Sequence, residues 1–435
     1  MPPSAREVVI GIDVGTSGVR AVAVAPDGAC AAQAAVAMAP PRRDGARVAQ
    51  APAVWGDAMA ECLDALHAQV DPGAVRALAI DATSGTVLLA DALGEPLGEA
   101  LMYNDASAVV QAARVGAVAP AASAARGAAS GLARALSLLA RSDAERAAHL
   151  LHQGDWLTGR LLGRFGDSDE NSALKTGYDP ASRAWPAWLD RLPLSQRLLP
   201  RVHVPGRPLG NVGAAALRRH GWRAGTQVVA GTTDGVAAFL ATGAAQLGDA
   251  VTSLGSTLVV KLLASGPLSA PASGVYSHRL GDRWLPGGAS SAGGASLLVH
   301  FDLARINELT PRLRPDEPTG LDYYPLPATG ERFPVNDPAF VSRVTPRPSD
   351  DARFLQGLLE GLAEIEGQAY ERLAELGAPP LRSVRSVGGG ASNSAWARIR
   401  ARRLGVPLLE PAHTEAAFGA ARLAADAMRR IGRWA

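Results

Sequence analysis

The chain has 435 residues, of which 47% are apolar and 19% charged, which is enough apolar material for two or three packed domains and excludes bulk disorder. Lysine and arginine number 43 against 41 acidic residues, so no excess of positive charge favours binding to nucleic acid or a membrane. Only Lys175 and Lys261 are lysines, and neither lies in a G-x-x-x-x-G-K-[ST] string, which excludes a P-loop.

The first half of the chain is predicted to open with strands and turns and to continue with helices. The predicted elements are strands over 8–13, 19–24, 75–80 and 87–90 and an amphipathic helix over 52–70. Residues 106–162 are predicted to be mostly helical. The stretch 191–210 is rich in proline and irregular, which is typical of the approach to a domain boundary.

The second half repeats the opening layout. Residues 250–261 again read as a strand, a Gly-Ser/Thr turn and a strand, a weak internal repeat that suggests two similar domains. Residues 311–350 carry many prolines and are predicted to be loop. The other predicted elements are strands from Gln227 and over 383–387, and helices over 236–242, 351–376, 394–404 and 414–428, the last capped by Thr414.

The two cysteines and the N-terminal residues indicate the cellular compartment in which the chain is expected to work. Cys30 and Cys62 form neither a C-x-x-C motif nor a zinc spacing with the eight histidines, so we expect two buried, free thiols in a reducing environment. Residues 1–7 are polar and hold no apolar leader segment, and no run of 18 apolar residues occurs. These features predict a cytoplasmic chain without a membrane span.

Four turns carry the polar residues that could do chemistry, and the first follows the opening strand. Asp13 ends that buried strand, where a carboxylate is costly unless it binds something. Thr16 and Ser17 follow in a Gly-rich turn whose N–H groups and hydroxyls suit phosphate oxygens. A carboxylate beside such a turn could hold Mg²⁺, although an ordinary hairpin turn is the alternative.

The other three turns are similar in kind. Residues 231–235 end a strand with hydroxyls and Asp234, which could cap the following helix or act as a general base toward a substrate hydroxyl. The turn at 255–257 mirrors the first and could hold phosphates from the other side. The turn at 388–393 has three successive glycines, which permit close approach of a ligand. Each of the last two could equally be an ordinary tight connection.

Taken in this order, the four turns resemble those of the FGGY carbohydrate kinase family, within the actin-like ATPase superfamily, and the resemblance covers nearly the whole chain. It is carried by GIDVGTS (11–17), LMYND (101–105), HQGDWLTG (152–159), SDENSALKTGYD (168–179), GTTDG (231–235), GGGASNSAW (388–396) and EAAFGAA (415–421). The turn DATSGT (81–86) and the Tyr-Asn-Asp string at 103–105 are most similar to the D-ribulose kinase and xylulose kinase-like branch. Ala82 departs from the glycine common in the matching turn, which could narrow the sugar pocket.

The resemblance implies an α/β fold of two actin-like (ribonuclease H-like) ATPase domains with a cleft between them. It implies an N-terminal FGGY domain over 1–215, mainly sugar-binding, and a C-terminal FGGY domain over 216–435, mainly nucleotide-binding. Asp234 would be the catalytic base and Asp13 would hold Mg²⁺. The implied substrate contacts are Asp13, Ser84, Asn104, Asp105 and Asp234, and the implied nucleotide contacts are Thr16, Ser17, Gly255, Ser256, Thr257, Gly293, Gly294, Gly389, Gly390, Ala391 and Asn393.

The implied activity is that of a cytoplasmic, ATP- and Mg²⁺-dependent kinase that phosphorylates a hydroxyl of a ketopentose, with D-ribulose as the first expectation. The alternative among enzymes is a kinase for xylulose or for a polyol such as erythritol or glycerol, because one hydroxyl contact can change which sugar fits. A nucleotide- and sugar-binding regulator without turnover is the alternative of another class, although Asp13 and Asp234 are both present. The expected partners are the two substrates alone, for a monomer or homodimer. Whether Lys261 reaches a phosphate stays open.

Overall fold

The computed structural model describes residues 6–127, 130–141 and 143–434, which divide into two compact units. The first unit runs up to Ala241 and takes in the C-terminal segment from Glu415, whereas Thr242–Thr414 form the second. The predicted boundary after residue 215 therefore falls inside the first unit. The reason is that β13 (Gln227–Thr233) pairs in parallel with β6 (Val75–Ala82), a central strand of the first unit.

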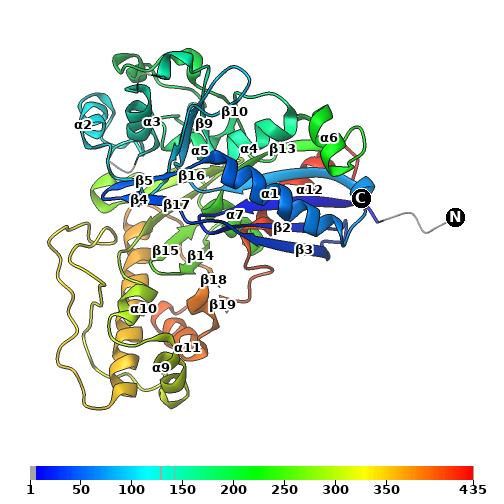
Figure 1. The fold of residues 1–435 in the computed structure, drawn as a ribbon. Coiled ribbons are helices and arrows are strands. Elements are labelled where there is room, and N and C mark those ends of the chain that lie inside the picture. The colour runs from blue at the N-terminus through cyan, green and yellow to red at the C-terminus, as the bar shows by residue number, and fades with distance from the viewer. Residues whose placement is uncertain (1–5, 128–129, 142, 435) are drawn as a thin grey trace. The chain divides into compact units, whose positions relative to one another are not determined.

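The first unit is built on a six-stranded mixed sheet (Figure 1). In spatial order its strands are β12 (Pro208–Asn211), β13, β6, β1 (Val8–Val14), β2 (Gly18–Val24) and β3 (Cys30–Ala37). The three strands β13, β6 and β1 run parallel, and β2 and β3 extend the sheet in antiparallel pairs. Every residue of β1 is buried, as expected for a central strand with a continuous apolar sequence.

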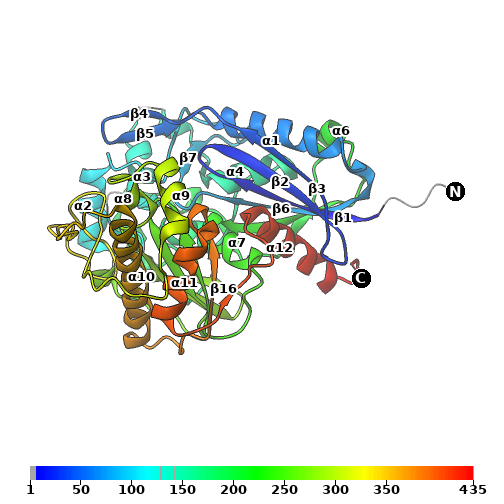
Figure 2. The ribbon, with the colours of Figure 1, turned by 90° about the horizontal axis from the view of Figure 1, so that it is seen from below.

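Helices cover both faces of this sheet. α1 (Pro52–His67) packs on β2 and β3, whereas α12 (Ala416–Arg430) packs on β1 and on α7 (Asp234–Ala241), and Figure 2 shows α1 and α12 on opposite sides of the sheet. The approach of α12 is so close that a Cβ at Gly11 would lie 1.9 Å from the carbonyl oxygen of Ala417. Only glycine fits at this point of β1, so this contact couples the end of the chain to its beginning.

A five-stranded sheet and further short elements complete the first unit. In spatial order this sheet holds β4 (Arg42–Asp44), β5 (Arg47–Gln50), β8 (Ala100–Leu101), β7 (Val87–Ala90) and β9 (His149–His152). The prediction of a mostly helical stretch over 106–162 missed β9, which pairs with β7. The remaining elements are α2 (Val109–Val118), α3 (Gly131–Leu139), α4 (Gln153–Leu162), β10 (Asp167–Asp169), α5 (Glu170–Leu174), β11 (Arg201–His203) and α6 (Ala214–His220).

The second unit has its own six-stranded sheet with a similar plan. Its strands, in spatial order, are β16 (Tyr276–Leu280), β17 (Arg283–Ala289), β15 (Leu258–Leu262), β14 (Asp249–Leu254), β18 (Ser383–Val387) and β19 (Leu408–Leu409). The antiparallel pair β14–β15 forms the strand, turn and strand that the repeat at 250–261 predicted, and it matches β1–β2. The parallel pair β14–β18 matches β1–β6 as well. Its helices are α8 (Gly294–Leu298), α9 (Leu303–Leu309), α10 (Asp351–Glu375) and α11 (Ser394–Leu404). Residues 313–350, all within the described part, form no helix and only isolated bridges.

Two local predictions are wrong. The N-cap of α12 is Glu415 rather than Thr414, and the Glu415 carboxylate makes no cap hydrogen bond but lies 3.2 Å from the guanidinium of Arg20. Cys30 is exposed because it opens β3, the edge strand of the sheet. Cys62 is buried and free as expected, and burial raises the pKa of its thiol to about 11.

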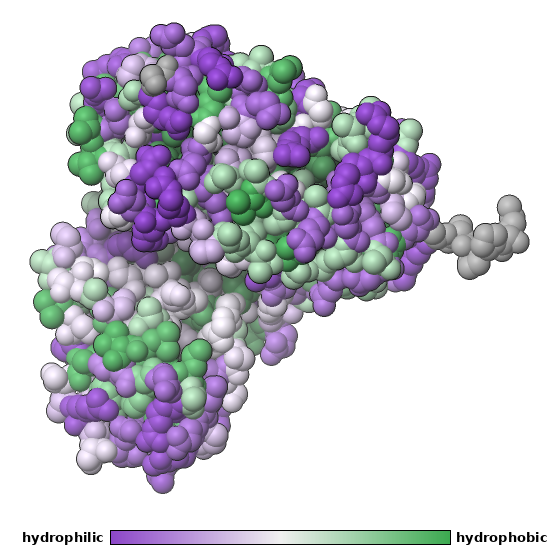
Figure 3. All heavy atoms as spheres, viewed as in Figure 1, coloured by the Kyte–Doolittle hydropathy of each residue, from purple (hydrophilic) through white to green (hydrophobic). Residues whose placement is uncertain are grey.

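The surface mixes polar and apolar side chains, and Figure 3 shows a patch of apolar side chains in the lower part of the view. Three exposed apolar residues of the second unit lie close together in the chain, namely Leu298 at the end of α8, Val299, and Leu303 at the start of α9. None of the helices in the described residues is long and apolar enough to cross a membrane. The prediction that the N-terminus holds no leader segment concerns residues 1–7, of which the first five lie outside the described residues.

Candidate active site

Three aspartates come together at the carboxyl ends of the parallel strands of the first unit. Asp13 of β1 lies opposite Asp81 of β6 in the strand register. Asp234 directly follows β13, whose Thr232 pairs with Asp81. Asp13 and Asp81 are buried, and Asp234 is half-buried. The parallel register thus builds one acidic cluster from three distant segments of the chain.

The surroundings of this acidic cluster disfavour its negative charge. Burial first and the charge of Asp234 second raise the pKa of Asp13 to about 6, against a lowering effect of the Arg20 guanidinium, which lies 3.4 Å away. Burial and the charges of Asp13 and Asp234 hold the pKa of Asp81 well above its usual range. Among the described residues, no N–H or hydroxyl donates to either carboxylate oxygen of Asp81. A proton or a cation is therefore needed to neutralise the cluster.

The donor set of the acidic cluster fits a hard divalent cation. Mg²⁺ prefers carboxylate and water oxygens, and the two Asp81 oxygens without a protein donor are available for such an ion or its waters. Asp13 was predicted from the sequence as a metal holder, but Asp81 was missed. The available signal was that Asp81, like Asp13, ends a buried apolar strand.

The residues predicted to face phosphate and to act as a base lie beside this cluster. Thr16 is half-buried and Ser17 exposed, in the turn between β1 and β2 that the Gly15 N–H closes on the Gly18 carbonyl at 3.0 Å. Asp234 is the first residue of α7, and its Oδ1 accepts the N–H of Gly235 at 2.6 Å. The positive end of the helix dipole lies at this carboxylate, whereas the nearby carboxylates of Asp13 and Asp81 act against its charge.

Buried polar atoms without a protein partner occur in the segments that surround the end of β6. They are Ser84 Oγ, Asn104 Oδ1, Gln153 Nε2 and Thr233 Oγ1. The Oε1 of Gln153 accepts the N–H and the hydroxyl of Thr83, at 3.2 and 2.6 Å, which leaves its amide nitrogen as a donor. Buried polar atoms normally have partners, so this set fits a ligand with several hydroxyls. Ser84 and Asn104 were predicted from the sequence, whereas Gln153 and Thr233 were missed.

A buried arginine holds together the two loops that carry these predicted sugar contacts. Arg134 of α3 donates to the carbonyl of Gly85 at 2.7 and 3.1 Å and to those of Tyr103 and Asp105 at 3.0 Å each. Burial lowers the pKa of its guanidinium to about 10, so the group stays charged at neutral pH. A planar guanidinium with several fixed donors suits this task, because one side chain then sets the spacing of both loops.

Asp105 has structural partners of its own. Its carboxylate accepts the N–H of Val48 at 2.7 Å and both the N–H and the hydroxyl of Ser107, at 3.1 and 2.9 Å. The residue is fully buried. These bonds position the loop, and the contact of Asp105 with the sugar stays a prediction.

The second unit brings most of the predicted nucleotide residues together. The turns at 255–257 and 388–393 leave the sheet at the same edge, because β14 and β18 are parallel neighbours. The N–H of Gly294 donates to the carbonyl of Gly255 at 2.8 Å, and that of Ala295 to Ser256 at 3.1 Å. Residues 293–294 therefore lie against the 255–257 turn, and this unit holds all predicted nucleotide contacts except Thr16 and Ser17.

Two polar side chains of the second unit are engaged within the protein. The Oδ1 of Asn393 caps α11 by accepting the N–H of Trp396 at 2.9 Å, and its Nδ2 donates to Thr310 Oγ1 at 3.2 Å. The Nζ of Lys261 donates to Nδ1 of His278 at 3.0 Å. Contacts of Asn393 with adenosine and of Lys261 with phosphate stay untested.

Gly293→Ala should weaken nucleotide binding and destabilise the second unit by about 1–3 kcal/mol. A Cβ at Gly293 would lie 2.6 Å from the carbonyl oxygen of Ser256 and 2.7 Å from Cα of Thr257, so the turn would have to open. Calorimetric titration with ADP and thermal unfolding measure the two effects. Gly266→Ala is the matched control, because a Cβ there meets no heavy atom within 4 Å. Equal ADP affinities for the two variants would contradict the assignment of this turn.

Comparisons with known proteins match most of the chain to one family. The N-terminal domain model of the FGGY family of carbohydrate kinases matches residues 8–121, and the C-terminal domain model of that family matches residues 250–428. A xylulose kinase of Escherichia coli (strain K12) is 27% identical over 95% of this chain and 89% of that protein. A xylulose kinase of Streptomyces rubiginosus is 30% identical over 96% of this chain and 87% of that protein.

Solved structures of similar fold agree with these matches. The crystal structure of a "xyloylose kinase" from Brucella ovis superposes with a TM-score of 0.89 at 25% identity, over 98% of this chain and 91% of that chain. Plasmodium falciparum glycerol kinase with ADP superposes with a TM-score of 0.83 at 14% identity, over 98% and 92% of the two chains. The similarity to the glycerol kinase structure supports the fold alone.

Proposed function

Since the chain belongs to the FGGY family of carbohydrate kinases, we propose that it transfers the γ-phosphoryl group of ATP to a hydroxyl of a ketopentose, D-xylulose rather than D-ribulose. Family membership makes the chain a sugar phosphotransferase that uses ATP, on the α/β fold of actin-like ATPases. The choice of sugar follows two relatives named xylulose kinase, which are 27% and 30% identical. The expectation of D-ribulose, which the turn at 81–86 suggested, gives way to this alternative.

The acidic cluster is the observation that carries the proposal. Phosphoryl transfer depends mostly on positioning and on neutralising the charge of the phosphates. Asp13 and Asp81 would hold Mg²⁺, which supplies that neutralisation when bound. Asp234 stands at the start of α7, beside the other two aspartates, and it would take the proton of the acceptor hydroxyl.

The two substrates would engage different sets of residues. Ser84, Asn104 and Gln153 offer a hydroxyl, a carbonyl oxygen and an amide nitrogen that no protein group satisfies, which suits the alternating hydroxyls of a ketopentose. The turns of the second unit offer backbone N–H groups and hydroxyls to the nucleotide. Arg134 would hold the sugar loops at a fixed spacing whether or not sugar is bound.

Ser84→Ala should raise the KM for the sugar by roughly tenfold while leaving the KM for ATP unchanged. The substitution removes one buried hydroxyl that has no protein partner, so the fold loses no bond. Steady-state kinetics with each substrate varied in turn measure both constants. Ser265→Ala, at an exposed serine of the second unit, is the matched control and should keep the sugar KM of the wild type. Equal sugar KM values for the two variants would remove Ser84 from the sugar site.

The direct test is ADP release with Mg²⁺-ATP across D-xylulose, D-ribulose, other ketopentoses, polyols and glycerol. The proposal expects the strongest stimulation with D-xylulose and its loss in Asp234→Asn. A larger kcat/KM with D-ribulose would restore the first expectation from the sequence. A flat panel with intact ATP binding would favour the regulatory alternative over a kinase.

A further inference from the structure

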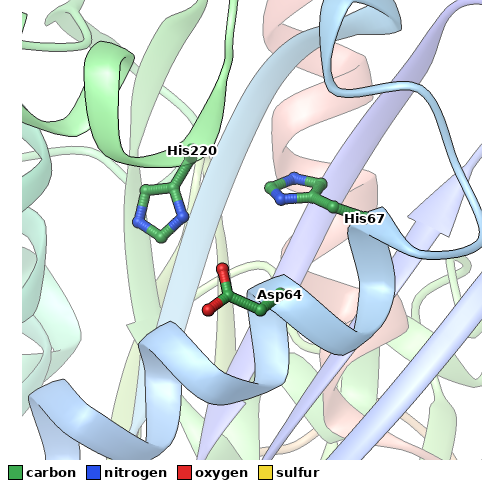
Figure 4. Close-up of side chains that lie close together, drawn as sticks. All are labelled: Asp64, His67 and His220. Carbon is green, nitrogen blue, oxygen red and sulfur yellow. The ribbon is translucent and has the colours of Figure 1, made fainter.

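A second group of ligand-forming side chains lies where α1 meets α6, outside the elements of the acidic cluster (Figure 4). Asp64 and His67 are one turn apart on α1, and His220 is the last residue of α6. One ligand atom of each side chain lies within 4.8 Å of the other two. Within the described ranges, this is the one such grouping of three histidine, cysteine or acidic side chains.

His220 provides an independent sign of a ligand. The residue is buried, with 8% of its surface exposed, and its Nδ1 has no hydrogen-bond partner among the described residues. Figure 4 shows its ring beside the carboxylate of Asp64 and the ring of His67. A buried imidazole nitrogen without a partner is unusual, and a bound ion would supply that partner.

Trp222 and a neighbouring hollow lie next to Asp64, His67 and His220. The indole stacks on the His220 ring with centroids 4.6 Å apart, and its Nε1–H donates to Nε2 of His67 at 3.0 Å. An ion that takes a nitrogen of either ring therefore changes the environment of Trp222. A hollow of about 520 Å³, lined in part by Asp64 and His220, gives the group access to solvent.

We propose that Asp64, His67 and His220 form a binding site for a divalent transition-metal ion of the class that includes Zn²⁺ and Ni²⁺. Two imidazole nitrogens and one carboxylate oxygen suit these ions and disfavour Mg²⁺, which prefers oxygen ligands. Ligand atoms around a tetrahedral zinc ion lie about 3.3 Å apart, so side chains now within 4.8 Å need to close by at most about 1.5 Å. Asp64 is exposed and can make most of this movement.

The surroundings of Asp64, His67 and His220 favour neutral imidazole rings, but they also include one positive charge that opposes a bound cation. Burial lowers the pKa of His67, and it lowers that of His220 to about 4, so both rings offer lone pairs near neutral pH. Arg219 donates to both oxygens of Asp64, at 2.9 and 2.6 Å. This pair is half-exposed and therefore weak, and each oxygen keeps a lone pair for an ion. The positive charge of Arg219 nevertheless opposes a cation.

The test is titration of the tag-free 435-residue chain with Ni²⁺ in excess Mg²⁺, followed by calorimetry and tryptophan fluorescence. Excess Mg²⁺ occupies sites made of carboxylates alone, and imidazole ligands still select Ni²⁺. We expect one Ni²⁺ per chain, with an affinity that falls at least about tenfold in Asp64→Asn, His67→Gln and His220→Gln. Arg219→Gln should bind Ni²⁺ more tightly than the wild type, a gain that misfolding cannot imitate.

Matched controls separate this group from other ligands on the chain. Asp57→Asn alters a carboxylate that lines the same hollow, and His300→Gln alters a histidine of the second unit, so both should keep the wild-type affinity. A Cys30→Ser background removes the exposed thiol as a ligand. Trp222→Phe should abolish the fluorescence change while calorimetry still records binding. Wild-type affinity in the three ligand variants, or no saturable Ni²⁺ isotherm for the wild type, would overturn the proposal.

Discussion

Asp234→Asn should lower turnover with Mg²⁺-ATP and D-xylulose by roughly 10²–10⁴-fold while ATP affinity stays within about twofold of the wild type. Asparagine has nearly the same shape, and its carbonyl oxygen can still accept the N–H of Gly235, which Asp234 accepts at 2.6 Å. It cannot take a proton from the sugar hydroxyl. ADP-release kinetics and calorimetric titration with ATP measure the two quantities on the same preparation.

The outcome separates two roles for Asp234. Asp44→Asn, at an exposed residue of β4, is the matched control and should keep full turnover. Wild-type turnover in Asp234→Asn would show that the base assignment is wrong. A parallel loss of turnover and of Mg²⁺-ATP affinity in a folded variant would instead place Asp234 among the groups that hold the ion.

Asp81→Asn should stabilise the metal-free chain against unfolding at pH 8, by at least about 1 kcal/mol, while it weakens Mg²⁺-dependent turnover. Asp81 is fully buried beside Asp13 and Asp234, and the described residues supply no donor to its oxygens. The charged form is therefore costly in the folded protein, and asparagine removes that cost. Stability gained at the expense of function is typical of a site built to bind an ion.

The raised pKa values of Asp13 and Asp81 also predict how the free energy of unfolding depends on pH. The folded pKa values of Asp13 and Asp81 lie above the ordinary value of 3.8, so the folded chain binds more protons than the unfolded chain. Stability from these groups is present at about pH 4 and is lost as pH rises through the folded pKa, which is about 6 for Asp13. For Asp13 alone the loss corresponds to about 3 kcal/mol.

Thermal unfolding in EDTA between pH 4 and pH 8 measures this loss. Asp81→Asn should reduce it, and added Mg²⁺ should stabilise the wild type at pH 8 more than the variant. Asp44→Asn should follow the wild type in both respects. A variant that is less stable than the wild type at pH 8 would mean that the Asp81 carboxylate is well solvated or bonded in the folded chain, and the assignment of an ion to it would fail.

The sequence by itself determined the local elements and the residues of the turns. A continuous apolar run predicted β1 as a buried strand, and the amphipathic pattern over 52–70 predicted the helix α1. Turns with glycine, serine and threonine after strands predicted which segments carry polar groups that could bind phosphate. These signals are readable because strand and helix periods, turn residues and caps depend on neighbours within a few positions of the chain.

Only the tertiary structure decided which of these residues act together. Asp81 joins Asp13 because β6 pairs in parallel with β1, and no spacing along the chain shows that register. Arg134 holds two loops together through hydrogen bonds to residues that lie 29 to 49 positions away in the sequence. The close packing of α12 on Gly11 likewise places the end of the chain in the first unit.

The same physical reason explains the errors in the prediction. The boundary after residue 215 followed a local run of prolines, but the membership of β13 in the first sheet is set by its partner β6. Cys30 was expected to be buried from its residue type, but its exposure follows from the place of β3 at the sheet edge. His220 and His67 lie far apart in the sequence, and only the tertiary contacts between α1 and the end of α6 bring them together. Local sequence patterns determine the secondary structure of each segment and the functional groups that it carries. Non-local strand pairing and helix packing decide which of these groups come together in one site.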